Sequence, residues 1–175
     1  MRYLLLAVAA TLLFSAAASA QTRKRPARKA TTPVKASTLP PLDVRAARAK
    51  VSDQLANVSR FVALLGSAAE AIEALDAEAK AKKVRKESLD KNAADKQRVV
   101  VTIRNLHEGM VKLESEFRVK PALKKYLPTI QGISTLAEQA VDSAVAGKLV
   151  TANTSLRSVQ QKLSDTLTAM PTAEL

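Results

Sequence analysis

A seven-residue repeat between Val44 and Ala79 constrains the fold more than any other feature of this chain. One position of the repeat is occupied by Val44, Val51, Val58, Leu65, Ile72 and Ala79, and the position four residues later by Arg48, Leu55, Val62, Ala69 and Asp76. This spacing predicts a long α-helix with one narrow, mostly apolar stripe. Such a helix needs partner helices to cover its stripe.

Three further apolar stripes predict these partners. We expect helices at residues 43–82, 89–118, 121–146 and 149–170. Short links between them predict an antiparallel up-down-up-down four-helix bundle at residues 43–171, with a long first hairpin and a shorter second hairpin, followed by a tail at 172–175. The predicted fold class is all-α.

The second hairpin has a self-consistent register. The residue numbers in each of six apolar pairs add to the same total: Ala144 with Ala152, Ala140 with Leu156, Ala137 with Val159, Ile133 with Leu163, Ile130 with Thr166, and Tyr126 with Met170. The pairing centres the turn on Lys148, beside Gly147, which we expect just beyond the third helix. Pro128 either kinks that helix or marks its start.

The sequence allows more than one register for the first hairpin. Pairing Val58 with Phe117 centres its turn between Glu87 and Ser88, although a slip of one heptad in either direction stays open. Either Ser88 or Asn92 could serve as the N-cap of the second helix, because short polar side chains accept hydrogen bonds from free backbone N–H groups.

The N-terminus predicts export. Residues 1–20 combine Arg2, an apolar run and a small-residue site ending at Ala20, which is typical of a signal peptide. The predicted location is therefore the periplasm or the medium, after cleavage near Ala20. The alternative is an inner-membrane anchor formed by residues 3–20, because cations follow the apolar run directly.

Residues 21–42 predict a disordered, basic, proline-rich arm. The chain has a formal net charge of +12, and this arm has no acidic residue. Its cations are Arg23, Lys24, Arg25, Arg28, Lys29 and Lys35. They form a candidate site for anionic envelope surfaces, either phospholipid or lipopolysaccharide. A solvated spacer is the equal alternative, and the lack of aromatic side chains argues against nucleic acid.

The sequence predicts no catalytic residue, cofactor or metal. The absence of cysteine excludes disulfides, thiol catalysis, thiolate metal sites and a C-x-x-C-H haem attachment. His107 is the only histidine and Arg104 stands where a Glu-x-x-His metal ligand pair would need a glutamate, so we expect a boundary or surface histidine. No G-x-S-x-G nucleophile motif is present.

A cluster of charges follows the first apolar stripe. Its acidic members are Glu70, Glu73, Asp76 and Glu78, and its basic members are Lys80, Lys82 and Lys83. We expect solvated pairs four residues apart on one helix rather than a cation or peptide site.

Two classes of function fit these observations. The first is a non-enzymatic adaptor, scaffold or chaperone-like binder of the cell envelope, with an unidentified protein partner or an anionic surface. The second is a periplasmic carrier of a small ligand or cofactor, held at a splayed end near Phe61, Phe117, Tyr126 and Met170. The sequence assigns no oligomeric state.

Overall fold

The computed structural model describes residues 39–81 and 84–172, and within these ranges it contains helices and no strand. The all-α class is therefore confirmed. The predicted signal peptide, the six arm cations and most of the predicted arm lie outside the described residues.

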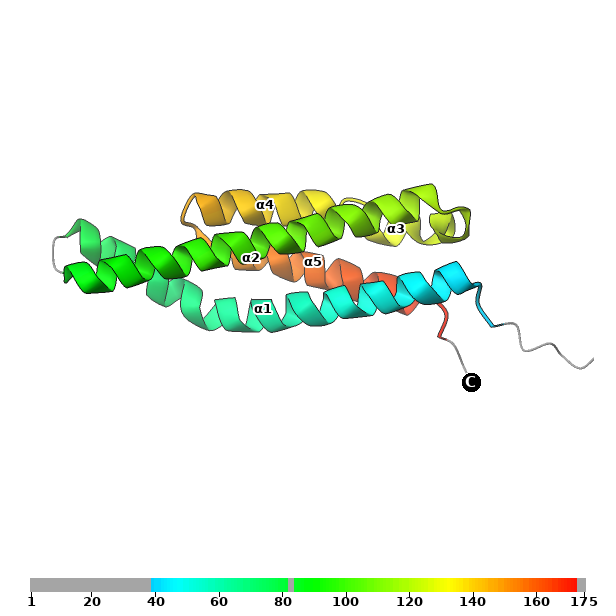
Figure 1. The fold of residues 1–175 in the computed structure, drawn as a ribbon, viewed down its shortest axis with the longest axis horizontal. Coiled ribbons are helices and arrows are strands. Elements are labelled where there is room, and N and C mark those ends of the chain that lie inside the picture. Colours follow the sequence, from blue (N-terminus) through cyan, green and yellow to red (C-terminus); the bar gives the residue numbers. More distant parts are fainter. Residues whose placement is uncertain (1–38, 82–83, 173–175) are drawn as a thin grey trace, which may run out of the picture. The chain divides into compact units, whose positions relative to one another are not determined.

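The chain forms two long helices followed by shorter ones. In order, they are α1 (Leu42–Lys80), α2 (Lys86–Val119), the 3₁₀ helix η1 (Pro121–Tyr126), α3 (Leu127–Ile130), α4 (Ile133–Val145) and α5 (Leu149–Ala169). Helix α1 packs mainly on α5, α5 on α4 and α4 on α2, whereas α1 and α2 contact each other less (Figure 1). By length and composition α1 could also cross a membrane, a property that it shares with core helices of soluble proteins.

The predicted apolar stripes form the core. Val44, Val51, Val58, Leu65 and Ile72 of α1 are buried, and so are all twelve residues of the predicted pairs in the second hairpin. These side chains are mostly aliphatic, and each large one contributes about 1.5–3 kcal/mol when it is fully buried. The core is therefore the main source of stability.

The α4–α5 turn matches its prediction. Gly147 has a φ of 75°, a backbone conformation that side chains disfavour. The N–H of Lys148 donates to the carbonyl of Ser143 at 2.9 Å, and the N–H of Gly147 donates to that of Ala144 at 3.0 Å. These bonds satisfy the last carbonyls of α4, as glycine-terminated helices commonly do.

The single helix predicted for residues 121–146 is wrong. This segment is divided into η1, α3 and α4, and the break lies at Gln131 and Gly132. Gly132 has a φ of 82°, which interrupts the helix. Pro128 is the second residue of α3 and therefore marks a helix start rather than a kink.

The predicted ends of the first hairpin also need correction. Helix α1 ends at Lys80 rather than residue 82, and α2 begins at Lys86 rather than residue 89. Arg85 occupies the N-cap position of α2, so neither Ser88 nor Asn92 is the cap. The turn is consequently closer to α1 than predicted.

The predicted register of the first hairpin is wrong as well. Asp76 contacts Asn92 and Lys96 of α2 instead of Val99. Asn92 lies seven residues before Val99, so the contact corresponds to the heptad slip that the sequence leaves open. Because successive heptads of α1 are similar, registers that differ by one heptad would bury similar side chains. The position of the turn decides which of these registers forms.

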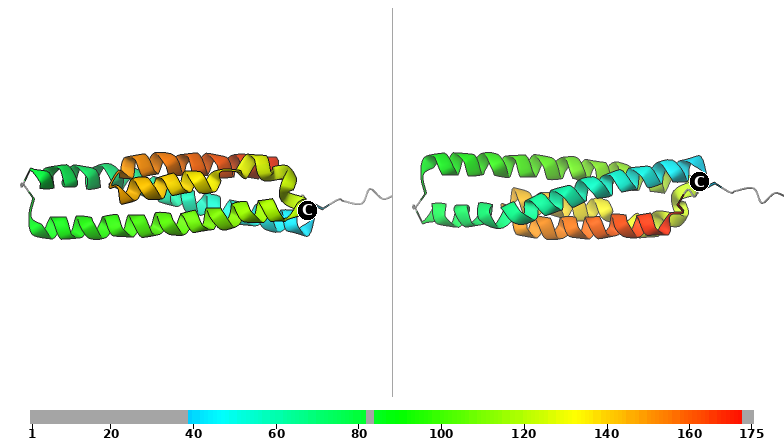
Figure 2. Two further views of the ribbon diagram at one scale, coloured as in Figure 1. Left: turned by 90° about the horizontal axis from the view of Figure 1, so that it is seen from above. Right: turned by 90° about the horizontal axis from the view of Figure 1, so that it is seen from below.

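Helices α1 and α2 continue beyond α4 and α5 (Figure 2). The N–H of Val150, near the start of α5, donates to Glu73 Oε1 at 2.8 Å. Helix α1 then runs on to Lys80 without α5 beside it. We call residues 74–81 and 84–98 the extension, and the helical residues that α4 and α5 cover the covered part.

Candidate functional site: a groove between α1 and α2

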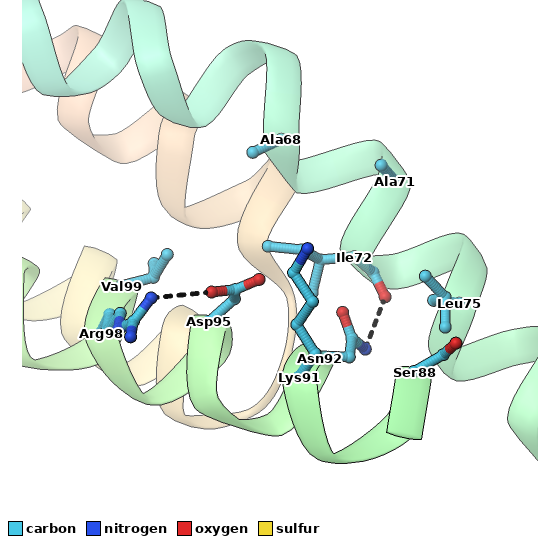
Figure 3. A pocket seen from close by; sticks show the side chains of 10 residues that line it. All are labelled: Ala68, Ala71, Ile72, Leu75, Ser88, Lys91, Asn92, Asp95, Arg98 and Val99. Atoms are coloured by element: carbon cyan, nitrogen blue, oxygen red, sulfur yellow. Dashed lines mark hydrogen bonds and ion pairs between the residues drawn. The ribbon is translucent and has the colours of Figure 1, made fainter. Parts of the chain in front are cut away.

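A groove of about 590 Å³ opens between α1 and α2, where the two helices leave α4 and α5 (Figure 3). Its lining is Ala68, Ala71, Ile72 and Leu75 from α1, and Ser88, Lys91, Asn92, Asp95, Arg98 and Val99 from α2. Helix α1 therefore supplies an apolar wall, and α2 supplies most of the polar groups.

The floor of the groove is apolar. Ile72 is 8% exposed, while Leu75 and Val99 are half-buried. Ala68 and Ala71 have no side chain beyond Cβ, so they leave space beside the backbone of α1. Apolar surface that stays in contact with water can gain free energy when a ligand covers it, at about 25 cal/mol per Å².

A polar cluster connects the two helices beside this floor. The side-chain amide of buried Asn92 donates to the carbonyl of Ile72 at 3.3 Å and to Asp76 Oδ1 at 2.8 Å. Lys96 Nζ lies 2.9 Å from both carboxylate oxygens of Asp76. We call Asp76, Asn92 and Lys96 the polar clamp. A buried asparagine between two helices favours the register in which its hydrogen bonds are made.

The rim of the groove is positively charged. Lys91 is exposed and extends from α2 toward α1 (Figure 3). Arg98 Nη1 lies 3.3 Å from Asp95 Oδ1, but the Arg98 side chain is 81% exposed, so this pair is weak. The charged residues of the lining are thus two cations, Lys91 and Arg98, and one carboxylate, Asp95.

The acidic cluster of α1 differs from its prediction. Two of its members bond across helices: Glu73 accepts the backbone N–H of Val150, and Asp76 binds Asn92 and Lys96. The expectation of simple pairs along one helix is wrong for these two residues. A carboxylate at a helix N-terminus is stabilised by the helix dipole, which explains Glu73.

At the end that the sequence predicts to be splayed, most of the named side chains are buried, although a cavity lies beside them. Phe117, Tyr126 and Met170 are buried, and Phe61 is half-buried. Tyr126 and Met170 also line a second cavity of about 590 Å³, together with Arg48 and the end of α5.

Arg48 interrupts the apolar stripe of α1 for a structural reason. Its Nη1 donates to the carbonyls of Leu167 and Met170, the latter at 2.8 Å. These carbonyls belong to the last turn of α5, where the helix leaves acceptors without partners. Arg48 therefore caps α5.

Glu114 is a buried carboxylate that sequence reasoning missed. Its side chain is only 3% exposed and accepts bonds from the N–H groups of Gly132 and Ser134 at 3.1 Å each, from Ser134 Oγ at 2.6 Å and from Arg118 Nη2 at 2.5 Å. Burial by itself would raise its pKa, but the bonds from Ser134, Arg118 and Gly132 lower this pKa to about 2. Glu114 thus caps α4 from another helix. No local sequence signal identifies it, because Gly132 lies eighteen residues away.

A surface network lies at the other end of α2. Glu116 binds Lys50 at 2.7 Å and Lys120 at 2.8 Å, and Lys120 also binds Asp43 at 3.0 Å. Burial acts to raise the pKa of Glu116, but the two lysines lower it overall. The carboxylates of Glu116 and Asp43 raise the pKa of Lys120. The network joins the start of α1 to the end of α2.

The remaining predicted features give no second site. His107 is half-buried on α2, and among the described residues no group of three or more His, Cys, Asp or Glu side chains could hold a metal. The chain matches no protein-family description, no curated protein and no solved structure. The groove is therefore the candidate site that the described residues support best.

Proposed function

We propose that this chain is an exported, non-enzymatic protein of the cell envelope that acts as an adaptor, scaffold or chaperone-like binder. The observation that supports this function is the open groove between α1 and α2, whose apolar floor stays accessible to a ligand. Its one carboxylate, Asp95, lies on the rim and pairs with Arg98. This arrangement suits recognition of an apolar surface better than chemistry on a small substrate.

Crosslinking in the native host tests this function. A photoreactive amino acid at Leu75, in the groove, should capture another polypeptide. The matched site is Leu64, which also lies on α1 and is 68% exposed but does not line the groove. Capture at neither site, or equal capture at both, would contradict binding through the groove.

The proposal includes the finer fold, an antiparallel up-down-up-down bundle of α1, α2, α4 and α5. Two bonds between α1 and α5 support opposite directions: Ser59 pairs with Gln160 at 3.0 Å, and Glu73 pairs with Val150 at 2.8 Å. Because the chain has no cysteine, Ser59→Cys with Gln160→Cys is a clean test. A short thiol-reactive crosslinker should join this pair, and it should not join Ser59→Cys to the exposed Thr154→Cys.

Export is also part of the proposal. Cleavage after residues 1–20 should give a mature chain that starts at Gln21 and is found outside the inner membrane. Intact mass measurements on fractionated cells test this outcome. Full-length chain in the inner-membrane fraction would instead support the anchor formed by residues 3–20.

The arm, residues 21–42, is proposed to attach the protein to anionic phospholipid or lipopolysaccharide. Each of its six cations can contribute about 1 kcal/mol near an acidic membrane at low salt. Co-sedimentation with anionic vesicles should therefore weaken steeply with salt and disappear in a chain that starts at Leu42. Equal binding of the shortened chain would leave the arm as a spacer.

A small-ligand carrier is the second candidate function. The cavity beside Arg48, Tyr126 and Met170 is large enough, at about 590 Å³, for a small molecule. Protein purified from its native host distinguishes the two functions. A bound compound visible by absorption or native mass spectrometry would favour the carrier, whereas a colourless protein that co-purifies with polypeptides would favour the adaptor.

A further inference from the structure

We propose that the groove binds an amphipathic helix with an acidic flank, supplied by another polypeptide. This inference rests on the proposed function as a binder and specifies the class of partner. Shape, apolar lining and charge each contribute to it.

The dimensions of the groove fit a short helix. Along α2 its lining extends from Ser88 to Val99, which is about 16 Å or three helical turns. Along α1 it extends from Ala68 to Leu75, about 10 Å. A bound helix would thus place apolar side chains at positions i, i+3 or i+4, and i+7 against the floor.

The lining allows such a helix to approach closely. Helix axes pack 8–10 Å apart, and the shorter distances need small side chains at the contact. Ala68 and Ala71 provide them on α1, while Ile72, Leu75 and Val99 offer apolar surface below. An apolar stripe on the partner would therefore exclude water from the floor.

The charges of the rim favour a partner with carboxylates beside its apolar stripe. Lys91 and Arg98 lie on the α2 side, and only Asp95 opposes them. Lys91, which extends over the groove, and the exposed Arg98 would attract a helix with carboxylates beside its apolar stripe.

The polar clamp keeps the groove formed before binding. Asp76, Asn92 and Lys96 bond α1 to α2 beside the floor. A site that already has its bound shape loses less conformational entropy on binding. Lys91, which extends over the groove, only has to change rotamer to admit a helix.

Synthetic peptides test this partner class. The first peptide has fourteen residues, with leucines at i, i+3, i+4 and i+7 and glutamates on the flank. The second replaces the glutamates with lysines, and the third keeps the composition of the first but breaks the leucine spacing. Fluorescence anisotropy with the purified protein should show at least about tenfold weaker binding of the second and third peptides.

Matched variants locate the binding. Ala71→Trp should fill the groove and weaken binding of the acidic peptide at least about tenfold, because the ring occupies the contact surface. Ala77→Trp makes the same change on the same helix, at an exposed position outside the groove, and should alter binding less than about twofold. Lys91→Glu should weaken binding, while Lys124→Glu, an equal charge change in η1, should not.

Circular dichroism first shows that each variant keeps its helices, and all four changes are at exposed residues. Equal binding of the acidic and basic peptides, or no effect of Ala71→Trp, would overturn the proposal. A dimer seen by sedimentation and lost in Ala71→Trp would assign the groove to a second copy. Binding to phosphatidylglycerol vesicles that is lost in the same variant would assign it to lipid.

The crosslink at Leu75 separates this inference from the proposed function. If Leu75 captures a polypeptide in the native host while the acidic peptide does not bind, the protein is a binder but the partner class is wrong. If Leu75 captures nothing and the peptide also fails to bind, both proposals are wrong.

Discussion

The covered part and the extension are built from the same two helices but are stabilised differently. In the covered part, α4 and α5 complete the burial of side chains such as Ile103 and Phe117, which are fully buried. In the extension and at its border, Leu75 and Val99 stay half-buried, and the inter-helix bonds come from the polar clamp. A similar heptad pattern thus gives a closed core in one region and an open surface in the other.

An apolar stripe becomes a buried core only where neighbouring helices cover it. The residue pattern alone does not decide this. A pair of helices alone buries too little surface to be rigid, because helical stability in proteins comes mostly from packing. We therefore expect the extension to be less stable than the covered part, although the polar clamp holds its two helices together, and its apolar atoms are accessible. Both properties are common in regions that bind partners.

The largest expected effect is in the covered part. Leu156→Asp would place a carboxylate at a fully buried position of α5 and should cost about 5 kcal/mol or more, enough to unfold the protein. Thermal melting followed by circular dichroism measures this loss. The matched change Leu64→Asp, at an exposed position of α1, should shift stability by less than about 0.5 kcal/mol. Similar melting of Leu156→Asp and the parent would contradict the closed core.

The next effect concerns Glu114, which is buried like the core but charged. Its pKa of about 2 in the folded state lies below the ordinary 4.5, so its contribution is complete above pH 4.5 and is lost as pH falls toward 2. That difference corresponds to about 3 kcal/mol. Urea unfolding should therefore show Glu114→Gln less stable than the parent by up to about 3 kcal/mol at pH 7 and by about 1 kcal/mol at pH 3. A gap that does not change with pH would exclude this role.

In the extension a smaller and more local effect is expected. Asp76→Ala removes the acceptor for Asn92 and Lys96 and should cost about 1–2 kcal/mol in local opening. Hydrogen exchange should become about tenfold faster in residues 74–98 while α5 is unchanged. Glu78→Ala, an exposed carboxylate two residues away, is the control. Uniform acceleration across α5 would mean that the extension unfolds only with the covered part.

The smallest effect is expected at the surface network. Lys50→Ala breaks the pair with Glu116, but the Lys50 side chain is 56% exposed, so the change should cost less than about 1 kcal/mol. The cost should fall further in 1 M salt because exposed charges are screened. Chemical denaturation at low and high salt measures both values, and a larger, salt-independent loss would place this network with the core.

Several parts of the fold follow from the sequence because their causes are local. The turn at Gly147 has its signal in the glycine itself, and the paired stripes of α4 and α5 begin directly beside it. The apolar stripe of α1 likewise predicts most of its buried residues, although Leu55 and Ala79 stay half-buried and Ala47 is buried outside the stripe. The all-helical class follows from these stripes.

Other parts do not follow, because their causes are distant in sequence. The break at Gly132 depends on the Glu114 carboxylate of α2, and the start of α5 depends on Glu73 of α1. The register of α1 against α2 depends on the turn near Lys86 and on the pairing of Asp76 with Asn92. Because the heptads of α1 resemble one another, the sequence does not indicate which register forms. The groove is a consequence of that register, so the sequence did not predict it.

The continuity of α1 also sets a distance. Its 39 residues form one uninterrupted helix, which corresponds to about 57 Å between its first and last residues. The chain enters this helix at Leu42, and the groove lies near the far end at Leu75. The start of α1 is therefore separated from the groove by most of the length of this helix. A contact made near Leu42 and a partner held in the groove would thus be kept far apart along a single helix.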